Sequence, residues 1–74
     1  MAKKGGGAVY RVTEVIGTSS NSWEDAARNA VRTAASTLRD LRIAEVTKLD
    51  VKIDDDGKIS QFRARLALSF KYDG

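Results

Sequence analysis

The 74-residue chain contains no cysteine and no histidine. Without cysteine it can form neither a disulfide framework nor a thiolate metal site. Without histidine it lacks the commonest general base, the commonest transition-metal ligand and the hydrolytic sites that pair histidine with serine or cysteine. No clustered pair of carboxylates replaces them, so nothing nominates a catalyst and we expect that the protein is not an enzyme.

Long hydrophobic runs are also missing. No apolar stretch approaches the roughly 18 residues of a membrane span, and no signal-peptide core follows the basic start of the chain. We therefore expect a soluble protein without a membrane partner, and we place it in the cytoplasm. The absence of cysteine is compatible with any compartment.

Positive charge is present but not concentrated. Thirteen Lys and Arg residues against ten Asp and Glu residues give a net charge of +3, and Lys3 and Lys4 stand in the opening segment "MAKKGGG". The arginines of the central segment are interleaved with acidic residues, whereas nucleic-acid surfaces cluster basic residues with stacking aromatics. We expect a solvated helix face there, with no nucleic-acid partner and no dedicated protein partner.

The opening glycines and lysines have no hydrophobic period, so residues 1–7 are predicted to be a flexible tail. Residues 8–74 then form a single domain. A domain of this size buries too little apolar surface for more than marginal stability. We therefore expect a homo-oligomer.

The first half of the domain predicts a strand followed by a helix. The segment "AVYRVTEVI" is rich in β-branched and aromatic residues and predicts a strand from about Ala8 that ends at Gly17. Ser19 or Ser22 is the expected N-cap of the helix that starts at Trp23. Its apolar positions, mostly alanine, follow helical spacing and allow a close approach to a sheet; they are 23, 26, 27, 30, 31, 34, 35, 38 and 41.

The end of this helix carries no capping glycine. We expect it to give way to a strand around Asp40 to Arg42.

Two alternating segments follow. In "RIAEVTKLDVKI", Leu49, Val51 and Ile53 alternate with polar residues, while Ala44 and Val46 lie in the opposite phase. A bulge near Thr47, or a strand whose two halves bury opposite faces, would reconcile them. The last strand, "KISQFRARLALSFKY", has a single apolar face predicted to be buried, made of Phe62, Ala64, Leu66, Leu68, Phe70 and Tyr72.

Together these elements predict an α+β protein in the order β-α-β-β. The two long strands are joined by a four-residue turn and should pair antiparallel, and the first strand should join the same sheet after the helix crosses one face. The result is a three-stranded antiparallel sheet wrapped on one helix. The other face and the edges need subunit partners.

At this point the chain resembles the dodecins, small flavin-associated proteins that assemble twelve β-α-β-β subunits into a hollow shell. The resemblance runs from about Tyr10 to Tyr72, through "YRVTEVIGTS", "WEDAARNAVRTA", the "AEV" at 44–46 and "LALSFK". It implies a hollow homododecamer that binds or stores a small ligand at subunit junctions.

Two positions depart from the flavin-binding members of that family. Those proteins carry a tryptophan two places before the Glu-Val, where this chain has Ile43, and a glutamine on the last strand, where it has Arg63. Isoleucine lacks the π-face on which a flavin stacks, and arginine changes the pattern of donors and acceptors. Both changes argue against tight flavin binding in the usual mode.

Other features are most similar to a dodecin subgroup described as calcium-binding. They are "SWED", the absent tryptophan before "EV", and the "DDDGKI" turn. Trp23 could replace the missing indole, but its place on the alanine stripe favours packing or a subunit contact.

The stretch "IDDDGK" at 53–58 has its own alternatives. An EF-hand register that ends at Gly57 would need acidic ligands at Lys52 and Arg63, so an EF-hand is excluded. As a hairpin, Asp56-Gly57 is a strong turn pair. Asp54 and Asp56 remain candidate metal ligands if symmetry brings copies of them together.

Glu45 is predicted to face the same side as Ile43. It either forms a salt bridge across the sheet with Arg63 or Arg65, or it lines an ion channel or a ligand pocket formed by Ile43, Glu45 and Arg63.

The leading hypothesis is a non-enzymatic shell that binds calcium. The first alternative is a flavin-binding shell for FMN, FAD or riboflavin with an altered pocket, and the second is a purely structural cage.

Overall fold

The computed structural model describes residues 7–71, in the order β1 (Tyr10–Ser19), α1 (Trp23–Ala35), β2 (Leu41–Ile53) and β3 (Ile59–Lys71). The predicted β-α-β-β order is confirmed. Residues 1–6 of the predicted tail, and residues 72–74 with Tyr72, lie outside the described residues.

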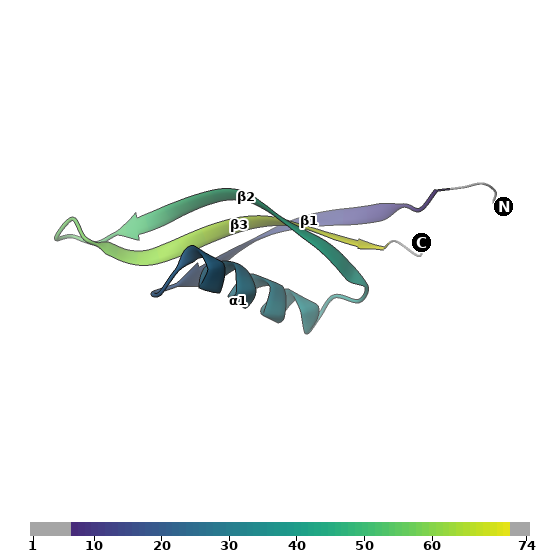
Figure 1. The fold of residues 1–74 in the computed structure, drawn as a ribbon, viewed down its shortest axis with the longest axis horizontal. Coiled ribbons are helices and arrows are strands. Elements are labelled where there is room, and N and C mark those ends of the chain that lie inside the picture. The colour runs from purple at the N-terminus through teal and green to yellow at the C-terminus, as the bar shows by residue number, and fades with distance from the viewer. Residues whose placement is uncertain (1–6, 72–74) are drawn as a thin grey trace.

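β3 is the central strand of the sheet, because it pairs antiparallel with β1 on one side and with β2 on the other. The helix packs on one face of this sheet, mainly over β1 and β3 (Figure 1). The expected three-stranded antiparallel sheet with one covering helix is therefore present. No helix within residues 7–71 is long and apolar enough to cross a membrane.

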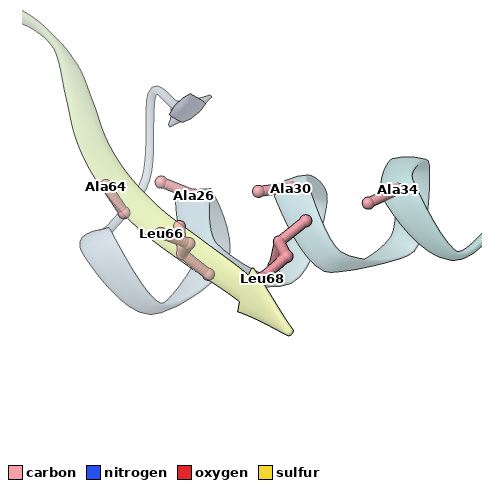
Figure 2. Packing of buried hydrophobic residues seen from close by; sticks show 6 residues of the cluster. All are labelled: Ala26, Ala30, Ala34, Ala64, Leu66 and Leu68. Atoms are coloured by element: carbon pink, nitrogen blue, oxygen red, sulfur yellow. The ribbon is translucent and has the colours of Figure 1, made fainter. Parts of the chain in front are cut away.

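The core between helix and sheet is thin and built from small side chains. Figure 2 shows the alanines of α1 facing the apolar face of β3. The buried hydrophobic residues of the described chain are Ala26, Ala30, Ala34, Ala64, Leu66 and Leu68. Phe62 and Phe70, which were predicted on the same face, are half-buried.

Gly17 explains how the helix comes so close. A Cβ atom at this position would overlap the carbonyl oxygen of Ala26 and lie 2.8 Å from the Cβ of Ala30. The sequence analysis predicted that the strand ends at Gly17, but β1 continues to Ser19. Here glycine permits close packing of strand against helix, and it does not act as a strand breaker.

The N-terminus of α1 is capped by Ser22, whose Oγ accepts from the backbone N–H of Asp25 at 3.0 Å. Ser19, the other candidate cap, is buried instead and donates its hydroxyl hydrogen to Oδ2 of Asp25 at 2.7 Å. Both serines thus organise the first turn, where the acidic Glu24 and Asp25 complement the helix dipole.

The strand predicted to begin around Asp40 to Arg42 does begin there, at Leu41, but the helix ends well before it. The helix stops at Ala35, and the carbonyl of Ala34 then accepts from the N–H groups of both Thr37 and Leu38 in a tight turn. Asp40 takes a φ of 55°, a left-handed conformation that reverses the chain into β2. The apolar spacing continues through this turn because Leu38 and Leu41 still pack against the core.

A bulge at Thr47 solves the phase problem in β2. Val46 pairs with Leu66 and Lys48 with Arg65, so Thr47 is the extra residue, and its hydroxyl donates to the Arg65 carbonyl at 3.1 Å. The first of the two alternatives is therefore confirmed, and the apolar residues on both sides of the bulge share the helix side of the sheet.

The molecule is long for its size. Its extents are 59 × 20 × 16 Å and its radius of gyration is 15.9 Å, against about 11 Å for a compact domain of this length. The β2–β3 hairpin projects beyond the helix (Figure 1). Large exposed hydrophobic residues lie on both sheet faces, among them Val12, Ile16, Ile43, Val46 and Leu49, and monomeric proteins rarely expose so much apolar surface.

Candidate functional site

The face of the sheet that the helix leaves uncovered is called the open face below. Side chains alternate along a strand, so the neighbours of the buried Ala64, Leu66 and Leu68 on β3 point to this face. The residues of β1 and β2 that lie directly opposite these β3 residues in the sheet belong to the same face. The open face includes Val12, Glu14, Ile16, Ile43, Glu45, Lys48, Asp50, Arg63, Arg65 and Ala67.

Ile43 and Glu45 lie on this face as neighbours along β2, as predicted. Ile43 is opposite Ser69 and is 59% exposed, and Glu45 is opposite Ala67. Glu14 of β1 is opposite Ala67 from the other side. The small side chain of Ala67 is thus flanked by two glutamates, an acidic row that the sequence alone did not indicate because it depends on the order of the strands.

Arg63 forms a salt bridge with Asp50 on the open face. Its Nε donates to Oδ1 of Asp50 at 2.6 Å, and its Nη2 donates to Oδ2 at 3.2 Å. This hydrogen bond, followed by the charges of Arg63 and Arg65, holds the pKa of Asp50 below its ordinary value. The same hydrogen bond raises the pKa of Arg63. The predicted salt bridge of Glu45 with Arg63 or Arg65 is not among the ion pairs of residues 7–71.

Asp50 is the residue that the sequence analysis missed. The alternation of Lys48, Asp50 and Lys52 was visible, but which arginine would lie opposite Asp50 depends on the bulge at Thr47. Since the bulge shifts the register by one residue, it brings Asp50 opposite Arg63.

One chain does not bring the three predicted pocket residues together. Ile43 is opposite Ser69, six residues along β3 from Arg63, which corresponds to about 20 Å of strand. Ile43 and Glu45 are adjacent, but Arg63 stands apart with Asp50. A pocket that used all three side chains would need more than one subunit.

The acidic stretch forms the turn of the β2–β3 hairpin. The N–H of Gly57 donates to the Asp54 carbonyl at 3.0 Å, and Gly57 has a φ of 79°. Oδ1 of Asp54 accepts from the backbone N–H groups of Asp56 and Lys58, at 3.0 and 2.9 Å. The predicted turn is confirmed, and one carboxylate oxygen of Asp54 stabilises it.

The turn has the donor chemistry for calcium but too few donors in one chain. Carboxylate oxygens are the ligands that this cation prefers, and it takes six to eight of them. Asp55 and Asp56 are exposed to solvent, and neither forms an ion pair within residues 7–71. No three acidic side chains of the described chain come together as a metal site.

Trp23 joins the helix to the hairpin. Its indole Nε1 donates to the backbone carbonyl of Asp50 at 3.0 Å. Its ring meets Phe62 edge to face, with centroids 5.1 Å apart. The predicted packing role is thus present within one chain, on the helix side of the sheet.

Comparison with known proteins identifies the fold. The sequence model of the Dodecin family matches residues 9–73. The calcium dodecin of Mycobacterium tuberculosis is 45% identical over 64 residues, which are 86% of this chain and 89% of that protein.

Solved structures agree with the sequence match. The dodecin of Streptomyces coelicolor superposes with a TM-score of 0.84 at 39% identity, over 100% of this chain and 99% of its own. The crystal structure of the M. tuberculosis calcium dodecin, described as having a novel calcium-binding site, gives a TM-score of 0.78 at 45% identity, over 88% and 91% of the two chains. The chain belongs to the dodecin family.

Proposed function

We propose that the protein is a non-enzymatic shell of twelve identical subunits that binds calcium at subunit junctions. Dodecins are small binding proteins, and one relative at 45% identity is named a calcium dodecin. The observation that carries the calcium proposal is the exposed turn with three consecutive aspartates, whose oxygens suit a hard cation. Asp54 and Asp56 are its proposed ligands.

The shortage of donors in one chain supports a site between subunits. No acidic cluster forms within residues 7–71, and a symmetric assembly repeats every carboxylate around its axes. Asp54 would contribute Oδ2, since its Oδ1 accepts two hydrogen bonds within the turn.

Calorimetric titration with calcium chloride tests the ligands. Asp54→Asn keeps an oxygen at the position of Oδ1 and removes the charge, so the turn is retained while calcium affinity falls. Asp56→Asn gives the second ligand test, and Lys58→Gln is a turn variant that removes no oxygen ligand. If calcium binds equally well to both aspartate variants, the proposed ligands are wrong.

Light scattering tests the shell. Twelve subunits of 8.1 kDa amount to about 97 kDa. A mass near that of one chain at micromolar concentration would refute the assembly.

The flavin alternative has its own test on the open face. Ile43 is exposed there, but Arg63, the other altered position, is engaged by Asp50. Quenching of riboflavin fluorescence by micromolar protein would support a flavin role, and its absence would exclude that alternative. If the shell binds neither calcium nor flavin, the remaining alternative is a purely structural cage.

A further inference from the structure

A groove between α1 and β2 lies on the helix side of the sheet. It has a volume of about 390 Å³ and is lined by Ala27, Arg28, Val31, Arg32, Ala44, Val46 and Leu66. It exists because the helix packs over β1 and β3 and makes few contacts with β2. Below it is called the α1–β2 groove.

The floor of the groove is apolar and its rim is basic. Val46 is 47% exposed although it faces the helix side. Arg28 and Arg32 stand one helical turn apart, and neither forms an ion pair within residues 7–71. Like charges at this spacing repel each other, so an acidic partner with an apolar base would complement both features of the groove.

The tip of the β2–β3 hairpin, residues 53–59, has the matching chemistry. Ile53 and Ile59 pair across the hairpin and are 62% and 54% exposed. Between them lie three aspartates and one lysine, Lys58, which give the tip a net charge of −2. Asp54 is engaged in the turn and Asp56 is a proposed calcium ligand, so Asp55 is the carboxylate left to form ion pairs.

The tip cannot reach the groove of its own chain. Val46 and Ile53 are seven residues apart along β2, about 23 Å, and the hairpin tip projects still further from the helix (Figure 1). A contact between two different surfaces of the same protein is heterologous, and it closes into rings or shells when the rotation allows.

We propose that the hairpin tip docks into the α1–β2 groove of a second copy of the chain. The side chains of Ile53 and Ile59 cover the apolar floor, and Asp55 lies between Arg28 and Arg32. This inference rests on the proposed shell and specifies one of its contacts.

Charge reversal tests the contact. Arg28→Glu with Arg32→Glu, and separately Asp55→Lys, should each lower the mass measured by light scattering to a fraction of that of the unaltered protein. All three changes in one chain restore opposite charges and should restore the mass. Arg39→Glu with Arg42→Glu changes the charge by the same amount as the arginine reversal, outside the groove, and should leave the mass unchanged.

Cross-linking gives a second measurement, which does not depend on whether the charge-reversal variants fold. The chain has no cysteine, so Asp55→Cys with Arg32→Cys introduces the only thiols. A short bismaleimide should then link chains into a ladder on a denaturing gel, and Asp55→Cys with Arg39→Cys should give far less.

The outcomes separate the inference from the function on which it rests. An unaltered chain that is monomeric overturns the shell and this contact together. An intact shell whose Asp55→Cys, Arg32→Cys variant gives no cross-linked ladder, or one that both charge reversals leave assembled, overturns the contact and leaves the shell standing.

Discussion

Asp50 and Arg63 stand directly opposite each other on β2 and β3, and the guanidinium of Arg63 donates to both carboxylate oxygens of Asp50, at 2.6 and 3.2 Å. The backbone carbonyl of Asp50 also accepts the indole N–H of Trp23. Asp50 therefore links the start of the helix, the second strand and the open face of the sheet. It also engages Arg63, one of the two residues that the sequence analysis expects to disfavour flavin binding.

Removing Arg63 should raise the pKa of Asp50. Arg63 lowers that pKa from its ordinary value of 3.8, so Arg63→Gln should return the Asp50 titration, followed by NMR, towards this value. The folded pKa is depressed, so the pair stabilises the protein above the unfolded pKa and loses this effect as pH falls through the folded pKa. Arg65→Gln, which removes a smaller contribution, should move the titration less. An unchanged Asp50 titration in Arg63→Gln would contradict the ion pair.

Gly17→Ala should destabilise the subunit strongly. Its Cβ would overlap the Ala26 carbonyl and crowd the Ala30 Cβ, so the helix must move away from the sheet. Overpacking of this kind costs about 1–3 kcal/mol, measurable by chemical denaturation. Gly7→Ala is the matched control, because a Cβ there meets no atom within 4 Å. Equal stability of the two variants would show that the helix does not pack this closely.

Gly57→Ala tests the hairpin turn. Gly57 has a φ of 79°, and a left-handed conformation costs a residue with a Cβ about 1–2 kcal/mol. Gly57→Asn should recover much of this loss, since asparagine tolerates that conformation. In thermal unfolding, the melting temperature should be highest for the protein with Gly57, lower for Gly57→Asn and lowest for Gly57→Ala. A different order would mean that the turn relaxes into another type.

Trp23→Phe should lose one hydrogen bond and keep an aromatic ring. The indole N–H donates to the Asp50 carbonyl, while the ring packs against Phe62. A hydrogen bond of this kind contributes about 0.5–1.5 kcal/mol, so denaturation should reveal a loss of that size. Trp23→Ala removes both interactions and should be less stable than Trp23→Phe. Equal stability of both variants would show that the ring contributes nothing.

Patterns within single segments predicted much of this fold. The change of phase around Thr47 indicated either a bulge or a strand whose two halves bury opposite faces, and the apolar residues of the last strand indicated its buried face. The helix end was wrong because Leu38 and Leu41 continue the apolar spacing through a turn that Asp40 reverses.

The candidate site could not be predicted in the same way, because it depends on which residues of neighbouring strands lie opposite each other. Asp50 reaches Arg63 only through the bulge, and Glu14 and Glu45 flank Ala67 only because β3 is central. Alternation within a strand assigns a side chain to a face, but it cannot say which residue of another strand stands beside it.

Ile43→Trp combined with Arg63→Gln should introduce flavin binding. Ile43 is exposed on the open face, so an indole fits there without displacing the core. A stacked aromatic pair contributes about 0.5–1.5 kcal/mol beyond the area it buries, or roughly a 2- to 10-fold gain in affinity for each ring. Ile43 and Arg63 are far apart within one chain, so the gain should require assembled protein. Riboflavin quenching measures it, and Ile43→Leu with Arg63→Gln, which adds no ring, should show none. An assembled tryptophan variant that does not quench would mean that further pocket positions also differ from those of flavin-binding dodecins.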